Sequence, residues 1–137
     1  MVLGFLSLTV QLKGQNTSKQ EYYQIKIYHI TQKAQEAPYA RIESFLLKAF
    51  PDYPEFLSPN YTTASSERIY ELRSYESATE TYGIKKIDMF NRGGEILIFK
   101  KLQFNPVFFA QVISGGRMPG LMYMPTFQNK ATQDENG

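Results

Sequence analysis

A six-residue pattern occurs twice in this chain of 137 residues, first as Tyr23–Tyr28 (YQIKIY) and again as Tyr70–Tyr75 (YELRSY). Both copies read tyrosine, polar, aliphatic, basic, any residue, tyrosine. Because side chains of an extended chain alternate between two faces, Ile25 and Ile27 fall on one face of a strand and Lys26 on the other. The repetition predicts two related strands in one β-sheet.

The composition predicts a single folded domain that is rich in sheet. Hydrophobic residues make up 42% of the chain, and ten Tyr and ten Phe without Trp favour half-buried strands and interfaces. The 15 basic and 13 acidic residues are mixed along the chain, which argues against a nucleic-acid partner. Because the chain has no Cys and one His, we expect no thiolate nucleophile, no disulfide, no metal site and no cofactor.

The first twenty residues allow two interpretations. Val2–Val10 is an apolar run of signal-peptide length, too short for a transmembrane segment, and no Lys or Arg precedes Lys13. This run is typical of a signal-peptide remnant with a cleavage point near Gly14, and it predicts a periplasmic or secreted protein. The alternative is that Phe5–Leu12 is an ordinary first strand and that the protein is cytoplasmic.

The next segments alternate between clear and ambiguous signals. Glu21–Thr31 has period-two alternation and predicts a strand, and Thr31–Pro38 predicts a loop. Ala40–Phe50 has apolar residues at helical spacing, so periodicity alone favours a helix there. Pro51–Ser66 has three prolines and many small polar residues, and predicts a linker.

The second half begins with a strand and continues into a helix. Glu67–Glu76 predicts the strand, and Ser77 with Glu80 three residues later has the spacing of a capping box. Gly93-Gly94 either breaks the helix or lets it lie close to the sheet. The helix is expected to bury one apolar face, formed by Ile84, Ile87, Phe90, Leu97, Ile98 and Leu102.

The C-terminal region predicts a hairpin and the start of another helix. Pro106–Ile113 and Leu121–Phe127 are apolar, aromatic runs joined by the turn-rich segment Ser114–Gly120. Asn129 stands at the start of a polar segment with helical character. Several methionine and aromatic side chains of the hairpin are either core or a soft binding surface: Met118, Met122, Met124, Phe108, Phe109, Tyr123 and Phe127.

These segments resemble the NIPSNAP family, which belongs to the ferredoxin-like, dimeric α+β barrel group. The resemblance covers Glu21–Gly137 and rests on Ile69–Tyr75, the helix after it and the hairpin that ends in Leu121–Phe127. It implies an α+β fold, a ferredoxin-like antiparallel sheet with a main helix on one face. It also implies that Arg41–Phe50 is a strand, which forms a hairpin with Tyr22–Ile30.

Family members often carry two tandem units, each ordered strand, helix, strand, strand, helix, strand, with the first and last strands side by side. The bacterial proteins that this chain resembles are typically exported. Residues 1–20 then form a signal remnant and polar lead, 21–50 an abbreviated first unit, 51–66 a linker and 67–137 an incomplete second unit. A sheet of about five strands with exposed edges would follow, which predicts pairing with another copy of the chain.

Candidate ligand-binding residues lie on the repeated strand and in the glycine-rich turn. Tyr70, Glu71, Arg73 and Tyr75 alternate along the strand, and Arg117 lies among backbone N–H groups that can hold an anion. If they converge on one pocket, they could bind a small apolar or aromatic ligand. The ordinary alternatives are an ion pair, edge packing and a chain reversal.

No catalytic residue is assigned. His29, the single histidine, has no evident partner in the sequence and is interpreted as a surface or turn residue. The leading hypothesis is therefore a NIPSNAP-domain protein that binds or scaffolds without catalysis and self-associates as a homo-oligomer. The alternative, by analogy of fold alone, is a small enzyme such as a cofactor-poor monooxygenase or a haem-handling protein.

Overall fold

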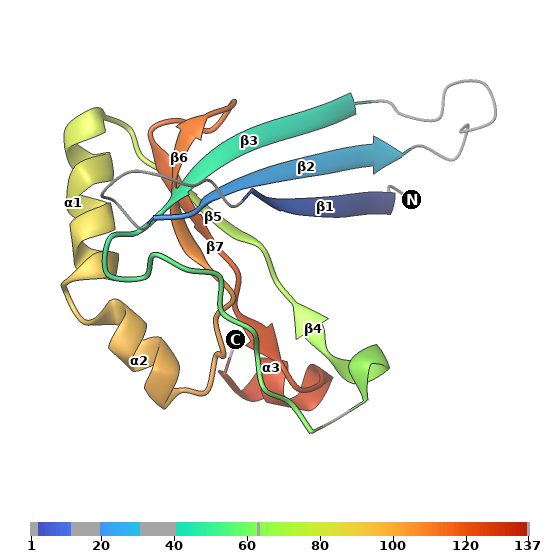
Figure 1. Cartoon of the computed structure of the whole chain (residues 1–137). Helices are drawn as coiled ribbons and strands as arrows, with labels where there is room; N and C mark the ends of the chain where they lie inside the picture. The colour runs from blue at the N-terminus through green and yellow to red at the C-terminus, as the bar shows by residue number, and fades with distance from the viewer. Residues whose placement is uncertain (1–2, 12–19, 31–40, 63, 137) are drawn as a thin grey trace.

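The structure is a computed structural model, which describes residues 3–11, 20–30, 41–62 and 64–136. The loop predicted at Thr31–Pro38 and the cleavage point near Gly14 lie outside these ranges. The main sheet of the described chain has six strands, every neighbouring pair is antiparallel, and the sheet is curled (Figure 1). Their order across the sheet is β1 (Leu3–Gln11), β2 (Tyr22–Ile30), β3 (Arg41–Ala49), β6 (Phe109–Ser114), β7 (Gly120–Tyr123) and β5 (Arg73–Glu76).

The first three strands form an antiparallel meander. β1 pairs with β2 along its whole length, so the strand alternative for the N-terminal segment is the one the structure contains. β2 confirms the strand predicted from alternation, and it pairs with β3 with Ile25 opposite Phe45. The helix that periodicity favoured at Ala40–Phe50 is wrong. Phe45 and Leu47 are buried while Leu46 between them is exposed, because pairing on both sides of β3 imposes the period of a strand.

The second copy of the repeated pattern is divided between two sheets. β4 (Ile69–Tyr70) pairs with β8 (Thr126–Phe127) in a separate two-stranded sheet, whereas β5 lies in the main sheet. The register is unchanged across the gap, from Ile69 opposite Phe127 to Glu76 opposite Gly120. The interruption lies opposite Pro125, which has no N–H to donate to the neighbouring strand. The predicted single β-layer therefore holds for the first copy and for the β5 part of the second.

The predicted long helix is broken at the glycine pair. α1 (Glu80–Asn91) and α2 (Glu95–Lys101) are separated by Gly93 and Gly94, and Gly94 has the left-handed φ of +88°. The N-cap is Thr79, whose Oγ1 accepts a hydrogen bond from the Tyr82 N–H at 3.3 Å. The prediction of Ser77 as the cap is wrong, because the Ser77 N–H donates to the Pro119 carbonyl instead.

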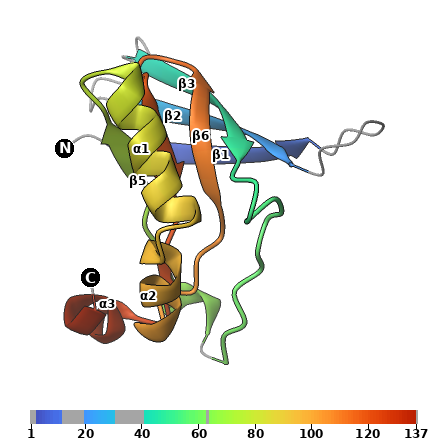
Figure 2. The same ribbon diagram turned by 90° about the vertical axis from the view of Figure 1, so that its left-hand side faces the viewer.

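The break changes which helical residues are buried. Phe90 of α1 and Ile96 of α2 are buried, with Ile87 partly so. Most of the expected apolar face is exposed: Ile84 on α1, and Leu97, Ile98 and Leu102 in or at the end of α2, which starts anew after the glycine pair. Figure 2 shows α1 lying across one face of the sheet, with α2 continuing below it.

The two faces of the sheet pack separate apolar clusters. On the helix side, α1 and α2 cover a cluster of Phe50, Phe90, Ile96, Phe109, Leu121 and Tyr123. On the inner side of the curl, a larger cluster includes Tyr23, Ile25, Phe45, Leu47, Ala110, Val112, Met122 and Met124. For the methionine and aromatic residues of the hairpin, the sequence left two alternatives open, core or soft binding surface. They are core, except Met118, which is exposed.

The C-terminal elements agree with the sequence. β6 and β7 form the predicted hairpin. α3 (Lys130–Asn136) begins after Asn129, whose Oδ1 accepts from the Thr132 N–H at 3.0 Å. The segment predicted as a linker contains only an isolated bridge and the start of the short 3-10 helix Ser65–Glu67 among its described residues. An α+β fold with a curled antiparallel sheet is thus confirmed. No helix in the described ranges is long and apolar enough to cross a membrane.

Candidate functional site

The five predicted ligand-binding residues do not converge on one cavity. Glu71 and Arg73 pair with each other, and Tyr75 lies next to them on β5. Tyr70 belongs to β4 and is 51% exposed. Arg117, in the β6–β7 turn, faces a carboxylate of β3 instead. The sequence therefore identified polar side chains that occupy three separate places.

Glu71 and Arg73 form a two-point ion pair. Arg73 donates from Nε to Oε1 at 2.9 Å and from Nη2 to Oε2 at 3.1 Å. Gln133 of α3 donates to the same carboxylate at 3.3 Å, and the guanidinium lies over the Phe104 ring at 5.7 Å. The Arg73 hydrogen bond lowers the pKa of Glu71, against the effect of burial. These side chains join β5 to α3 and have little capacity left for a ligand.

Tyr75 packs on a buried tyrosine of the neighbouring strand β7. Its ring stacks on Tyr123 with centroids 6.0 Å apart and an interplanar angle of 6°, and it also contacts Phe90. Burial raises the pKa of Tyr123 to about 12, with Arg73 opposing and Tyr75 adding to the rise. The Lys86 Nζ lies 5.1 Å from the centroid of the Tyr75 ring. One face of Tyr75 is therefore fixed, while the residue as a whole stays exposed.

A groove of about 420 Å³ runs between β5 and α1. Tyr75 lines it from the strand, and Tyr82, Lys86 and Met89 line it from the helix. Tyr82 and Met89 are 63% and 48% exposed, so the walls are apolar surface in contact with water. This groove was not predicted from the sequence. The available signal was the spacing of Tyr82, Lys86 and Met89, which places them along one stripe of the helix.

The outer edge of β5 borders this groove. The Glu71 N–H donates to the Pro125 carbonyl at 3.0 Å and the Ser77 N–H to the Pro119 carbonyl at 2.8 Å, so both residues point their backbone groups inward. Antiparallel alternation then directs the N–H and C=O of Ser74 and Glu76 outward. No strand of the described chain pairs with this edge. We define Arg73–Glu76 and the adjacent groove as the β5 edge site.

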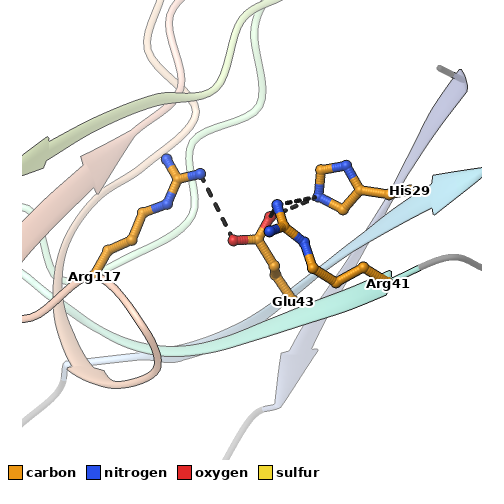
Figure 3. Close-up of polar contacts among 4 residues, drawn as sticks. All are labelled: His29, Arg41, Glu43 and Arg117. Carbon is orange, nitrogen blue, oxygen red and sulfur yellow. Dashed lines mark hydrogen bonds and ion pairs between the residues drawn. The ribbon is translucent and has the colours of Figure 1, made fainter. Parts of the chain in front are cut away.

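A second polar cluster surrounds Glu43 (Figure 3). Its Oε2 lies 2.6 Å from His29 Nε2 and 3.3 Å from Arg41 Nη2, and its Oε1 lies 3.8 Å from Arg117 Nη2. The His29 hydrogen bond lowers the pKa of Glu43, and both arginines act in the same direction. His29 therefore has a carboxylate partner that the sequence alone did not identify, because pairing of β2 with β3 brings the two together.

The structure offers no metal centre in the part of the chain it describes, since no three His, Cys, Asp or Glu side chains there are placed to hold an ion. In comparisons with family models, with curated proteins and with solved structures, no family, protein or structure matches this chain.

Proposed function

We propose that this chain is a non-enzymatic binding or scaffold protein that self-associates through the β5 edge site, and that it is an abbreviated member of the NIPSNAP family. The carrying observation is the outward N–H and C=O groups of Ser74 and Glu76 beside an exposed apolar groove. An open strand edge is a template for another strand, and water-exposed aromatic walls gain from being covered.

The order of the elements supports the ferredoxin-like part of this proposal. β5 is followed by the α1–α2 helical segment, β6 and β7, and β7 lies between β5 and β6 in the sheet. This is the order of the first strand, helix, second strand and third strand in a ferredoxin-like unit. The last strand of such a unit lies beside the first. The open edge of β5 is therefore the position of a strand that the described chain does not supply.

A second copy of β5 can pair with this edge in a two-fold register. In a two-fold antiparallel pair, Ser74 and the partner's Glu76 exchange backbone hydrogen bonds, and Tyr75 lies opposite the partner's Tyr75. Facing aromatic residues on neighbouring strands stabilise a sheet. The same pairing places residues of the second copy over the exposed side chains of Tyr82 and Met89 in the groove.

The geometry favours this function over the enzyme alternative. That alternative requires Tyr70, Glu71, Arg73 and Arg117 to line one pocket. Glu71 and Arg73 instead neutralise each other, and Arg117 lies with Glu43. Binding through a strand edge needs none of these side chains to be free.

Self-association is tested by measuring mass in solution for a matched pair of variants. Ser74→Pro removes only an outward N–H, and edge strands tolerate proline where the N–H faces solvent. Ser74→Ala keeps that N–H. Sedimentation velocity should give a dimer for the wild type and Ser74→Ala, and a monomer for Ser74→Pro with unchanged circular dichroism. A wild type that stays monomeric at high concentration, or a folded Ser74→Pro variant that remains dimeric, contradicts the proposal.

A further inference from the structure

The cluster around Glu43 places two arginines on opposite sides of one carboxylate. Arg41 hydrogen-bonds to Oε2, whereas Arg117 stands 3.8 Å from Oε1, beyond hydrogen-bonding distance. Figure 3 shows Glu43 between the Arg117 guanidinium and the pair formed by His29 and Arg41. Within the described chain, Arg117 makes no hydrogen bond, so its five N–H groups are available.

Arg117 has a second contact that does not depend on Glu43. Its guanidinium lies 5.8 Å from the centroid of the Phe45 ring. The turn that carries it also rests on Phe45, since a Cβ on Gly115 would lie 2.7 Å from the ring atom Cδ1. With its guanidinium carbon over the ring, Arg117 directs Nη2 toward Glu43. The arginine would therefore keep its place if Glu43 moved.

Charge and exposure also favour an external anion. Two guanidinium groups face a single carboxylate, which leaves an excess positive charge even with a neutral His29. The side chains of Arg41 and Arg117 are 64% and 42% exposed, so a small solute can reach both. Guanidinium groups bind the oxygens of planar or tetrahedral oxyanions, and Glu43 already offers one carboxylate oxygen to each arginine.

We propose that Arg41 and Arg117 form an oxyanion-binding site for the carboxylate or phosphate group of a small ligand, with Glu43 as its internal competitor. This inference is independent of the β5 edge site, since the two sites share no residue. It assigns opposite effects to neighbouring residues: removal of the Glu43 charge strengthens binding, and removal of the Arg117 charge weakens it. An ion-pair network with only a structural role has no such signature.

The test is an NMR titration of the full chain with inorganic phosphate and, in a separate arm, with acetate, against sodium chloride at equal ionic strength. Shifts of the Arg41 and Arg117 Nε–H signals report binding, and the two arms show which oxyanion is preferred. The dissociation constant should fall about tenfold in Glu43→Gln and rise about tenfold in Arg117→Gln. Arg92→Gln, at an exposed position on the helix side, is the matched control and should leave it unchanged.

Two results overturn the proposal. One is an equal response of Arg41, Arg92 and Arg117 to both anions, which would indicate general screening. The other is a dissociation constant that Arg117→Gln leaves unchanged while the amide spectrum shows a folded chain. Because Arg117 is a turn residue with a half-exposed side chain, this second measurement remains decisive even if Glu43→Gln unfolds.

Discussion

Arg73 holds Glu71 through two parallel hydrogen bonds, and the two residues flank the point where β4 ends and β5 begins. Residues two apart on an extended chain lie on the same face, so the pair can close without bending the strand. Gln133 joins the same carboxylate from α3. The ion pair thus fixes the C-terminal helix to the interrupted strand, and its loss should be felt in stability rather than in ligand binding.

Glu71→Gln should lower the free energy of unfolding by about 1 kcal/mol at pH 7, since the pair is partly exposed. The pKa of Glu71 is lower in the folded state, so its contribution is present above the unfolded-state pKa and is lost as the pH falls through the folded-state value. The wild type should therefore lose more stability than the variant on acidification. Urea unfolding at pH 7 and at acidic pH measures the difference, with exposed Glu135→Gln as the control. Equal acid sensitivity in wild type and Glu71→Gln would contradict the assignment.

Tyr123 should make the fold sensitive to alkaline pH. Its pKa is about 12 in the folded state, against about 10 for an unperturbed tyrosine. The unfolded chain releases this proton first, so the contribution is complete below about pH 10 and decreases as the pH rises toward 12. Tyr123→Phe should flatten that decrease, as measured by denaturant unfolding across this range, while exposed Tyr82→Phe should not. If absorbance at 295 nm showed that the Tyr123 phenol titrates normally in the folded protein, this prediction would be wrong.

Gly120 should tolerate no side chain. A Cβ there would lie 2.4 Å from the backbone oxygen of Tyr75 and 2.8 Å from that of Arg117, so β5 and β7 would have to separate. Gly120→Ala should cost about 2 kcal/mol or more of unfolding free energy. Gly116→Ala, in the same turn with nothing within 4 Å, is the matched control and should stay within about 0.5 kcal/mol of the wild type. Similar midpoints for the two variants in urea would disprove the close approach of the strands.

The strands that alternate strictly could be read from sequence, and the exception has a physical cause. β2 places Tyr23 and Ile25 in the core with the polar Gln24 between them. β3 carries Leu46 on its exposed outer face, so its apolar residues coincide with helical spacing. Only pairing with β2 and β6, which is a property of the whole sheet, selects the strand.

The candidate sites were harder to predict because they depend on how the strands pair and on where α1 lies relative to β5. Glu43 meets His29 and Arg117 only when β2, β3 and the β6–β7 turn are assembled. The groove exists because α1 places Tyr82 and Met89 beside β5. The contacts of Glu43 have no local signal, and the helical stripe of Tyr82, Lys86 and Met89 does not show which strand edge lies beside it. The Glu71–Arg73 pair, two residues apart in an extended segment, does have one.

The N-cap of α1 is Thr79 in the structure, whereas the sequence predicted Ser77. Thr79→Ala should cost about 1 kcal/mol, since the Tyr82 N–H would lose the hydroxyl that accepts its hydrogen bond. Ser77→Ala should be close to neutral, because Ser77 uses its backbone N–H, which alanine retains, to bind the Pro119 carbonyl. Unfolding free energies of the two variants decide between the caps. A larger loss for Ser77→Ala than for Thr79→Ala would restore the capping box, and would move the first turn of the helix that forms one wall of the groove.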